Sequence, residues 1–384
     1  MYELVEISNK QCESSKAIKK EATWSESLFF YRHSVRGLSG ASCAKYIDLF
    51  LDLPSIIYNG DKNYIPERKA ETVSWLSGKH KCAGFLKQKN LLVLRSGSPA
   101  ARGIAFINTI GSFGSIGFLE FLEDLQAVSL LVDGARDFFR ENGIGVIFAP
   151  MNGSIWSSYR LMTKGFEDKP FLGEPYNKAY YSALLMKCGF KTAKKWETQF
   201  VKKVSAKGGK TDKYLEIEKS QRSKGIKIRR MQKFDTDIRI IHKIVMNSFS
   251  NFYLFHELDE QSFVDIYADM KLICNKRTVR IAYSPKNRPV GFGIALPDYR
   301  NKLAFLSRYA KRYIFLYLGT LQENGVSLYP QCGKAIIISI LRSLFWRRKG
   351  YICAMMSEDS KTRGFSDGYQ KLHEYALFEL EAEL

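Results

Sequence analysis

The 384-residue sequence lacks the cysteine and histidine patterns that hold a metal or build a disulfide framework. Its seven cysteines are scattered singly without a Cys-x-x-Cys pair, which is typical of reduced thiols in the cytosol. Its five histidines show neither His-x-x-x-His nor His-Glu-x-x-His spacing, and no second ligand pair accompanies His80 and Cys82. We therefore predict a protein with no metal.

Long apolar runs are also missing. The first twenty residues are polar and of mixed charge, without the apolar core that a signal peptide needs. The longest apolar stretch, near residues 335–346, carries Arg342 and is shorter than the roughly 20 residues that span a bilayer. No repeat with a period of about 20–50 residues is visible, which excludes a solenoid. We expect a soluble, cytoplasmic protein that does not bind membranes.

Negative charge is scarce, and the positive excess is unevenly distributed. The net charge is +20, and residues 187–233 hold 16 Lys and Arg against 4 acids, a net +12. Such an excess indicates a polyanionic partner, for example a phosphorylated cofactor, an acidic carrier protein or a nucleic acid. The alternative is a solvated, lysine-rich linker without a ligand.

The first half of the chain reads as a layered α/β unit. Apolar spacing over residues 41–53 predicts an amphipathic helix that Pro54 ends, and residues 91–108 predict a strand, a turn and a strand. The segments that follow predict a strand over 111–124, a helix over 125–142 ended by Gly143, a strand over 144–149 and a helix over 178–188. This order indicates strands layered against helices.

A similar order begins again after residues 204–225, which are rich in Lys, Gly and Ser. We predict that this segment is a basic linker between domains 1–203 and 226–384. The second half predicts a strand over 226–231, two helices, a strand, turn and strand over 277–298, a strand over 313–321, a helix from Gly333 to Arg348, and a last strand over 351–356 before a polar C-terminal region. Each domain is expected to be a mixed, mostly antiparallel sheet flanked by helices.

Several motifs resemble those of bacterial tandem proteins of the GNAT (N-acetyltransferase-like) superfamily. In the first half they are FLDLPSIIYNGDKNYIPE (50–67), GSFGSIGFLEFLED (111–124), APMNGSIWSSYRLMTKGF (149–166) and EPYNKAYYSALLMKCGF (174–190). The second half resembles the family's C-terminal domain more loosely, through NSFSNFYLFHELDEQSF (247–263) and NRPVGFGIALPD (287–298). The resemblance covers most of the chain and implies two tandem GNAT domains.

The resemblance also implies where an acyl donor would bind. GNAT enzymes hold the donor's pantetheine between two splayed strands and its pyrophosphate on a Gln/Arg-x-x-Gly-x-Gly/Ala loop at a helix N-terminus, where free N–H groups attract anions. The equivalent first-domain stretch, GFLEFLED, has no glycine after Gly117. It places Glu120, Glu123 and Asp124 at the predicted helix start, where they would repel a pyrophosphate. We do not expect this domain to bind coenzyme A in the usual way.

In the second domain, the equivalent loop ends in Gly333, Lys334 and Ala335. These residues are our candidates for binding coenzyme A or acyl-CoA, with Lys334 offering a charge to a phosphate. Pro330 stands where the family has Gln or Arg. The alternative is that Gly333 serves only the geometry of a turn.

Acyl transfer to an amine needs a base, an oxyanion donor and an acid for the leaving group. The resemblance implies an acid tyrosine four residues before a Gly-Phe pair. Here that register, counted from Gly189-Phe190, falls on Leu185. Tyr181 lies one helical turn earlier, with Tyr180 beside it, and could replace the acid if the thioester shifts by about 5.4 Å. Both tyrosines could instead be packing residues.

Polar and aromatic residues are densest between residues 150 and 181, in loops that follow a predicted strand. Glu174 is a candidate base, Arg160 could clamp a carboxylate or phosphate, and Trp156 could stack on a planar group. The full set of candidate substrate-binding residues is Asn152, Ser154, Trp156, Tyr159, Arg160, Tyr176 and Asn177. The alternative is a loop held together by its own polar residues, with Asn152 as a helix cap.

These observations lead to three functional hypotheses. The first is an acyltransferase that moves an acyl group from acyl-CoA or an acyl carrier protein to a small-molecule amine. The second is an aminoacyl transferase that takes its donor from tRNA, which the charge of +20 favours. The third is a degenerate, non-catalytic GNAT pair that binds a ligand or a partner.

Overall fold

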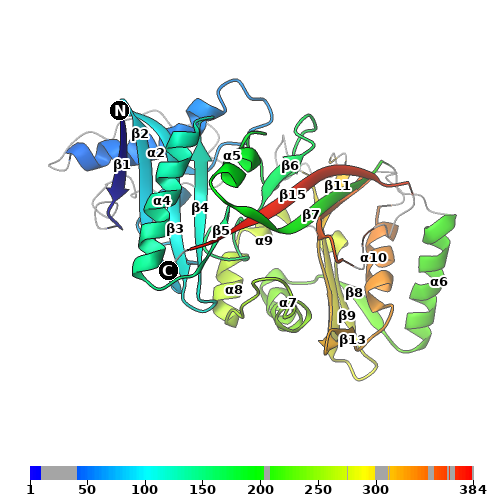
Figure 1. Cartoon of the computed structure of the whole chain (residues 1–384). Helices are drawn as coiled ribbons and strands as arrows, with labels where there is room; N and C mark the ends of the chain where they lie inside the picture. The colour runs from blue at the N-terminus through cyan, green and yellow to red at the C-terminus, as the bar shows by residue number, and fades with distance from the viewer. Residues whose placement is uncertain are drawn as a thin grey trace. The chain divides into compact units, whose positions relative to one another are not determined.

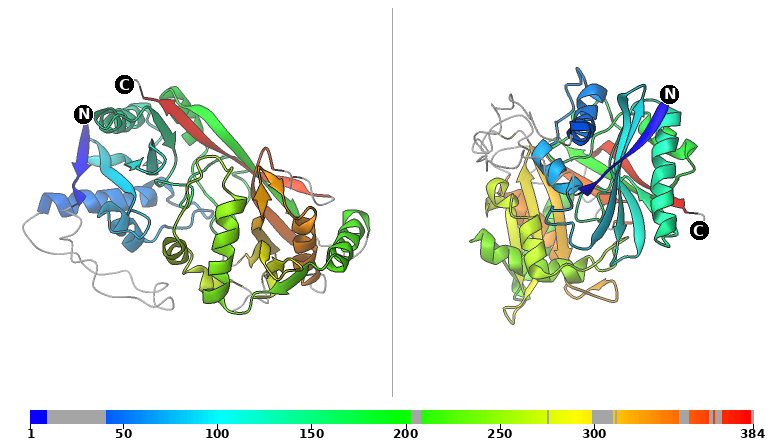
Figure 2. Two further views of the ribbon diagram at one scale, coloured as in Figure 1. Left: turned by 90° about the horizontal axis from the view of Figure 1, so that it is seen from below. Right: turned by 90° about the vertical axis from the view of Figure 1, so that its left-hand side faces the viewer.

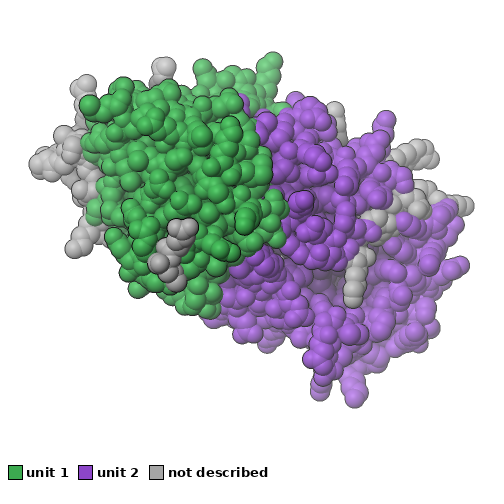
Figure 3. All heavy atoms as spheres, in the orientation of Figure 1, with its two compact units in different colours: residues 1–161, 180–193, 377–384 green, residues 162–179, 194–376 purple. Residues whose placement is uncertain are grey.

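The computed structural model describes residues 1–9, 41–202, 208–274, 276–298, 310, 312–344, 350–360, 363 and 368–382. The chain divides into two compact units (Figure 3). Unit 1 comprises residues 1–161, 180–193 and 377–384, and unit 2 comprises residues 162–179 and 194–376. The units differ from the predicted domains, because a C-terminal segment belongs to unit 1 and residues 162–179 belong to unit 2. The predicted limits 1–203 and 226–384 therefore stay a prediction.

Unit 1 is a mixed sheet with helices on both faces (Figure 1). Its elements are β1 (Tyr2–Ile7), α2 (Ala41–Ile57), α3 (Lys69–Leu76), β2 (Leu86–Arg95), β3 (Ser98–Asn108), β4 (Phe113–Phe121), α4 (Leu125–Glu141), β5 (Val146–Ala149) and α5 (Tyr181–Lys187). The strands lie in the order β1-β2-β3-β4-β5, and the end of β15 (Gln370–Glu381) pairs with β5. Only β4 and β5 pair in parallel within this order.

Helices α2 and α4 cover opposite faces of this sheet (Figure 2). Neighbouring residues of a strand point to opposite faces. On β3, the Arg102 side chain reaches Phe50 of α2, whereas a Cβ on Gly103 would lie 3.5 Å from Leu131 of α4. Gly103, which has no side chain, therefore leaves room for α4 on one face, and the long polar side chain of Arg102 points to α2 on the other.

Unit 2 repeats the arrangement. Its described elements are β6 (Leu161–Lys164), β7 (Lys191–Val201), α6 (Gly209–Ser223), β8 (Lys227–Arg230), α7 (Phe234–Ser248), α8 (Glu260–Ile266), α9 (Met270–Ile273), β9 (Val279–Tyr283), β10 (Pro289–Pro297), β11 (Arg312–Thr320), β12 (Gln322–Glu323), β13 (Val326–Ser327), α10 (Cys332–Arg342), β14 (Gly350–Ser357) and most of β15. The main sheet runs β7-β14-β11-β10-β9-β8, with β11 and β14 parallel. Strands β6 and β7 each begin in unit 1.

The two faces of the unit 2 sheet are covered in the same way as in unit 1. A Cβ on Gly293 of β10 would contact Ile336 and Ile340 of α10, whereas the neighbouring Phe292 ring packs near Phe249 at the end of α7. Each unit thus has an antiparallel meander, a helix and a parallel strand in the same order. The structure confirms the predicted α/β class and the repetition of one fold.

Three sequence predictions need correction. The helix predicted to stop at Pro54 continues to Ile57. The predicted linker 204–225 contains helix α6, which buries Tyr214 against α10. The polar C-terminal region contains the long strand β15, which buries Tyr375 and Leu377 among other residues. The predicted helix end at Arg348 lies outside the described residues.

Candidate functional site

Arg102 is the buried centre of a polar cluster in unit 1 because helix α2 contains a proline. Pro54 has no N–H, so the Phe50 carbonyl one turn earlier receives no helical hydrogen bond. The Arg102 guanidinium donates to this Phe50 oxygen at 2.6 Å. The helix then continues, since the Tyr58 N–H donates to the Pro54 oxygen at 2.9 Å. Arg102 therefore satisfies the carbonyl that Pro54 leaves without a donor, and the helix continues past the residue at which the sequence predicts its end.

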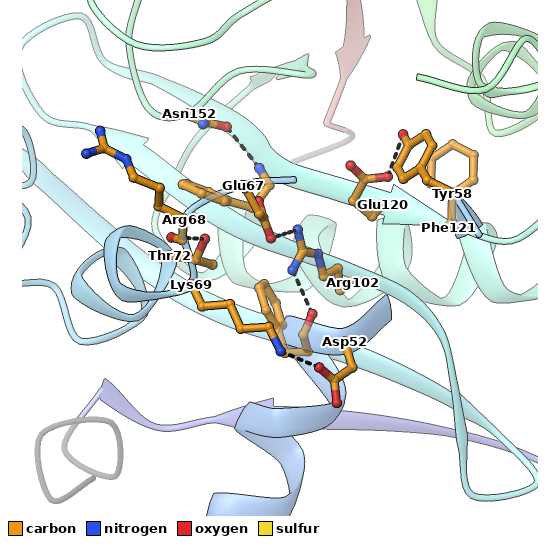
Figure 4. Close-up of polar contacts among 12 residues, drawn as sticks. Asp52, Tyr58, Glu67, Arg68, Lys69, Thr72, Arg102, Glu120, Phe121 and Asn152 are labelled. Atoms are coloured by element: carbon orange, nitrogen blue, oxygen red, sulfur yellow. Dashed lines mark hydrogen bonds and ion pairs between the residues drawn. The ribbon is translucent and has the colours of Figure 1, made fainter. Parts of the chain in front are cut away.

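The charge of Arg102 is balanced by Glu67, which follows α2. The Arg102 side chain is fully buried, and its second terminal nitrogen lies 2.5 Å from a Glu67 oxygen (Figure 4). Glu67 keeps 29% of its side chain exposed, so this ion pair lies at the border of the interior. The Arg102 Nε is buried and has no hydrogen-bond partner among the described residues.

Glu120 of β4 lies directly opposite Arg102 in the register of β3 and β4. One carboxylate oxygen, Oε2, accepts hydrogen bonds from Tyr58, which directly follows α2, at 3.0 Å and from Tyr181 of α5 at 2.5 Å. The Tyr181 hydroxyl in turn accepts from the Phe121 N–H at 3.2 Å. Figure 4 shows the Glu120 carboxylate and the Tyr58 hydroxyl facing each other. Three elements therefore converge on one half-buried carboxylate.

Burial raises the pKa of the Glu120 carboxyl from its ordinary value of 4.5 to about 7, although Arg102 and the two tyrosine hydroxyls act in the opposite direction. Glu67 adds to the rise because two carboxylates repel each other. Burial also raises the pKa of Tyr181 well above its ordinary value, followed by repulsion from Glu120. The carboxyl of Glu120 is thus the group of this cluster that changes charge near neutral pH.

This raised pKa predicts a specific loss of stability with rising pH. The folded state holds the Glu120 proton up to about pH 7 and the unfolded state only to about pH 4.5, so stability falls as the pH rises between these values. Glu120→Gln mimics the protonated form and should lack this component. We expect Glu120→Gln to gain about 1–3 kcal/mol relative to the wild type between pH 5 and 8 in urea unfolding.

Glu123→Gln is the matched control for this measurement. It removes the same charge three residues away at an exposed position, and its stability should follow that of the wild type with pH. Parallel pH profiles for the wild type and Glu120→Gln would contradict the assignment of this titration to Glu120.

The α4 N-terminus in unit 1 is occupied by the protein itself. Asp124 caps the helix by accepting a hydrogen bond from the Ala127 N–H at 3.2 Å, and it also accepts from Tyr2 and Arg95. Although burial opposes ionisation, these bonds hold the pKa of Asp124 below its ordinary value. A carboxylate at this position repels anions, so the absence of ordinary coenzyme A binding in this domain stays a prediction. Glu120, however, lies inside β4 and not at the helix start.

The gap between β4 and β5 is also closed in unit 1. The two strands pair only at Gly114–Ile147 and Ser115–Phe148. Beyond that point, the Met151 N–H donates to the Ile116 oxygen at 2.9 Å, and the Asn152 side chain accepts from the Phe118 N–H at 2.9 Å. A Cβ on Gly117 would lie 2.5–2.7 Å from atoms of residues 151 and 152. These contacts occupy the place where the resemblance to GNAT proteins implies a pantetheine arm.

The corresponding strands of unit 2 separate without such closure in the described residues. β11 and β14 pair from Arg312–Gly350 to Phe315–Cys353. No β11–β14 pair follows Phe315–Cys353 in the described residues, whereas the other edge of β14 pairs with β7 from Tyr351–Val201 to Ser357–Trp196. Helix α10 follows β11 and begins without a side-chain cap. A Cβ on Gly333 would contact only Leu318 and Thr320, at 3.7 and 3.9 Å, and the Lys334 ammonium lies 6.0 Å from the Tyr214 ring centre.

The predicted site residues are divided between the two compact units. Asn152, Ser154, Trp156, Tyr159 and Arg160 belong to unit 1, whereas Glu174, Tyr176 and Asn177 belong to unit 2. Asn152 is not a helix cap, since no helix follows it, and its side chain is engaged with Phe118. The Ser154 hydroxyl accepts from the Trp156 N–H at 3.3 Å, and the Arg160 guanidinium donates to the Tyr159 hydroxyl.

Two of the predicted residues in unit 2 make extensive internal contacts. Asn177 is buried and bridges the Met162 backbone, accepting from its N–H at 2.8 Å and donating to its oxygen at 3.1 Å. Glu174 is fully buried: Oε2 accepts from the Phe171 N–H at 2.7 Å, and Oε1 contacts His373 at 2.5 Å and the Tyr375 hydroxyl. These contacts favour a structural role, so the role of Glu174 as a base stays a prediction.

Tyr180 and Tyr181 lie beside Glu120 in unit 1. The Tyr180 hydroxyl donates to the Phe121 oxygen at 2.8 Å, and the Tyr181 hydroxyl is engaged with both Glu120 and the Phe121 N–H. Sequence reasoning missed Tyr58, Glu67, Arg102 and the strand position of Glu120. A usable signal for the strand position of Glu120 was its place between the apolar residues Leu119 and Phe121.

No family model matches the chain, and the similarity to known proteins is distant. Over 264 residues it is 21% identical to Protein YghO of Escherichia coli (strain K12), which is 67% of each chain. It matches a tandem GNAT protein from the clavulanic acid biosynthesis pathway with a TM-score of 0.51 and 10% identity, over 100% of this chain and 99% of that one. A probable N-acyltransferase of Enterococcus faecalis V583 matches with the same TM-score and identity, over 100% and 73%.

These two structures establish the fold. The chain has the tandem GNAT fold that its motifs resemble, with one copy of the strand and helix order in each unit.

Proposed function

We propose that the protein is an N-acyltransferase that moves an acyl group from a thioester donor, acyl-CoA or an acyl carrier protein, to an amine of a small molecule. The observation that carries this proposal is the separation of β11 from β14 next to the uncapped start of α10. Separated parallel strands leave the backbone of β11 available to an extended pantetheine arm. In the first turn of α10 the Cys332 N–H donates to the Tyr329 oxygen at 3.0 Å, and the N–H groups of Gly333 and Lys334 lie at the helix start, where backbone N–H groups attract phosphate.

The equivalent region of unit 1 differs from that of unit 2, and this difference supports a donor site in unit 2. Its equivalent strands are bridged by Met151 and Asn152, and its equivalent helix is capped by Asp124. We therefore propose that the donor binds in unit 2, with Gly333, Lys334 and Ala335 at the phosphate end. The model contains no helix, in the part of the chain that it describes, with the length and apolarity to cross a bilayer. Within the same residues, no group of three or more His, Cys, Asp or Glu side chains could hold a metal ion.

The positive segment 187–233 is compatible with either form of the donor. Some of its charges are neutralised in unit 2, since Lys194 pairs with Asp359 and Arg229 pairs with Asp237 at 2.7 Å. Others, including Lys195, Lys202, Lys224, Lys227 and Arg230, are exposed. An acidic carrier protein or a tRNA would meet these exposed charges, whereas coenzyme A would need only a few of them.

Lys334→Gln tests the donor site directly. If Lys334 contacts a donor phosphate, its loss removes a charge-assisted hydrogen bond of about 1.5–3 kcal/mol. The dissociation constant of coenzyme A should then rise about 10- to 100-fold in isothermal titration calorimetry. Gly333→Ala should keep the fold, because its Cβ meets only ordinary contacts, and should weaken binding if the ligand approaches this backbone.

Arg342→Gln is the matched control on the same helix. It removes the same charge eight residues further along α10, about 12 Å away, where Arg342 pairs with Glu218 at 2.9 Å. Its affinity for coenzyme A should equal that of the wild type. Equal losses in Lys334→Gln and Arg342→Gln would indicate a general charge effect and would place the donor elsewhere.

A further inference from the structure

The polar cluster of unit 1 holds one more negative group than its own cation can neutralise. The one buried cation of this cluster, Arg102, donates a hydrogen bond from each terminal nitrogen, one to Glu67 at 2.5 Å and one to the Phe50 oxygen at 2.6 Å. Glu120 is therefore attracted electrostatically by Arg102 but accepts no hydrogen bond from its terminal nitrogens. When Glu120 ionises, the cluster of Arg102, Glu67 and Glu120 carries a net negative charge in a partly desolvated place.

The two oxygens of Glu120 are used unequally. Both tyrosine hydroxyls donate to Oε2, and none of the described residues donates a hydrogen bond to Oε1. Stacking fixes both donors, because Tyr58 stacks on Tyr64 at 3.9 Å and Tyr181 stacks on Phe121 at 4.0 Å between ring centres. The orientation of the open oxygen is thus set before any ligand arrives.

Several charged or titratable groups surround this carboxylate. They come from the segment after α2, from β3, from the residues before α4 and from the start of α5, and are Tyr58, Tyr64, Glu67, Arg102, Glu123, Tyr180 and Tyr181. Arg102 is the one cation in this set, and Glu67 already pairs with it. An added cation would therefore meet one unneutralised carboxylate.

We propose that Glu120 Oε1 binds the ammonium group of an organic primary amine, so that unit 1 contains an amine site. The geometry selects this class of ligand. A guanidinium needs both oxygens of a carboxylate for its paired hydrogen bonds, and the two tyrosines occupy one of them. Calcium takes six to eight oxygen ligands, and one carboxylate oxygen is open here. An ammonium is compact and can direct one of its three N–H donors to a single open oxygen while the other two stay with water.

Binding at this site exchanges a cation for a proton. Burial keeps the carboxyl protonated until the pH approaches 7, and an ammonium takes the place of that proton. The balanced step is Glu-COOH plus R-NH₃⁺ giving the ion pair of Glu-COO⁻ and R-NH₃⁺ plus one released H⁺. No bond to carbon forms or breaks. Ligand affinity should therefore rise with pH and become constant above the pKa of the free carboxyl.

The proposal goes beyond the acyl-transfer proposal, because it concerns amine binding within unit 1 alone. Amine binding itself needs no thioester and can be measured without one. A failure of amine binding and a failure of coenzyme A binding at Lys334 are thus separate results.

The test measures the pKa of Glu120 in the full-length protein labelled with ¹³C at the glutamate carboxyl carbons. NMR spectra are recorded across pH in ethylammonium chloride and in sodium chloride at the same ionic strength, and Glu120→Gln identifies the signal. Each tenfold excess of ethylammonium over its dissociation constant should lower the Glu120 pKa by about one unit. Tetramethylammonium has no N–H donor and should lower it less.

Two variants serve as controls for this experiment. Glu123→Gln should keep the full ethylammonium effect. Tyr58→Phe removes one donor to Oε2, so it should raise the pKa of Glu120 in sodium chloride. That pKa should still decrease in ethylammonium. If Glu120→Gln folds poorly, the changed pKa in Tyr58→Phe identifies the Glu120 signal instead. A Glu120 pKa that is the same in ethylammonium and sodium chloride would overturn the proposal. So would an equal decrease with tetramethylammonium, since that result shows a field effect without ammonium hydrogen bonds.

Discussion

Arg102→Leu is expected to lower the free energy of unfolding by about 3–5 kcal/mol, because it breaks a buried ion pair and leaves its partners unsatisfied. Glu67 loses its cation at 2.5 Å, and the Phe50 oxygen, which Pro54 already deprives of a helical hydrogen bond, loses its remaining donor at 2.6 Å. Leucine fills part of the volume but supplies neither hydrogen bond. Urea unfolding followed by circular dichroism measures the effect.

Arg95→Leu is the matched control on the neighbouring strand. Arg95 also pairs with a carboxylate, Asp124, at 2.9 Å, but half of its side chain (51%) is exposed. Exposed pairs of this kind contribute about 0–1 kcal/mol. The double variant Arg102→Leu with Glu67→Gln should recover part of the loss, because it removes the unpaired charge. Similar losses in Arg102→Leu and Arg95→Leu would contradict the conclusion that the buried hydrogen bonds of Arg102 to Phe50 and Glu67 stabilise the fold.

The sequence predicts much of this fold because periodicity and turn residues act locally. The strand, turn and strand of residues 91–108 correspond to β2 and β3, and the helix 125–142 corresponds to α4. Gly143, predicted to end that helix, has a φ of +68°. The strand predicted over 351–356 lies within β14, Gly350–Ser357. Apolar spacing also identified the strand, turn and strand of 277–298, which are β9 and β10.

The candidate site was harder to predict because tertiary contacts decide it. Pro54 predicts a helix end from local geometry, and only the distant Arg102 makes continuation possible. Glu120 lies 18 residues from Arg102 in sequence, and only the β3–β4 register places the two side by side. Acids before a helix are typical of caps, so local reasoning assigned Glu120 to the start of α4 with Asp124. The structure divides these roles between a strand and a cap.

Glu174 shows the same limit over a longer distance. It was chosen as a base because it lies in a loop rich in polar and aromatic residues. The partners that enclose it, His373 and Tyr375, are about 200 residues away, with separations of 199 and 201. No local pattern connects these residues with Glu174. The tyrosine hydroxyl also contacts Thr198 at 2.9 Å, which extends the hydrogen-bonded group to β7.

Glu174→Gln is expected to lower the free energy of unfolding by about 3–5 kcal/mol and to leave the turnover of the folded protein unchanged. The variant keeps the size of the side chain but replaces a buried carboxylate that His373, Tyr375 and the Phe171 N–H all contact. The amide cannot accept from all of them, so at least one buried donor loses its partner. Thermal and urea unfolding measure stability, and thioester consumption per folded molecule measures activity.

Glu374→Gln is the matched control, since Glu374 pairs at the surface with Lys164 at 3.1 Å and Lys371 at 3.4 Å. Its stability should change by less than about 1 kcal/mol. If Glu174 instead acts as the base predicted from the sequence, Glu174→Gln should lower turnover by about 10²–10⁴ with little change in stability. The two outcomes differ in which quantity changes, so a single variant decides between a structural and a catalytic carboxylate. His373→Phe separates them further: it should reduce the cost of Glu174→Gln if the pair is structural, because the two substitutions remove the same contact.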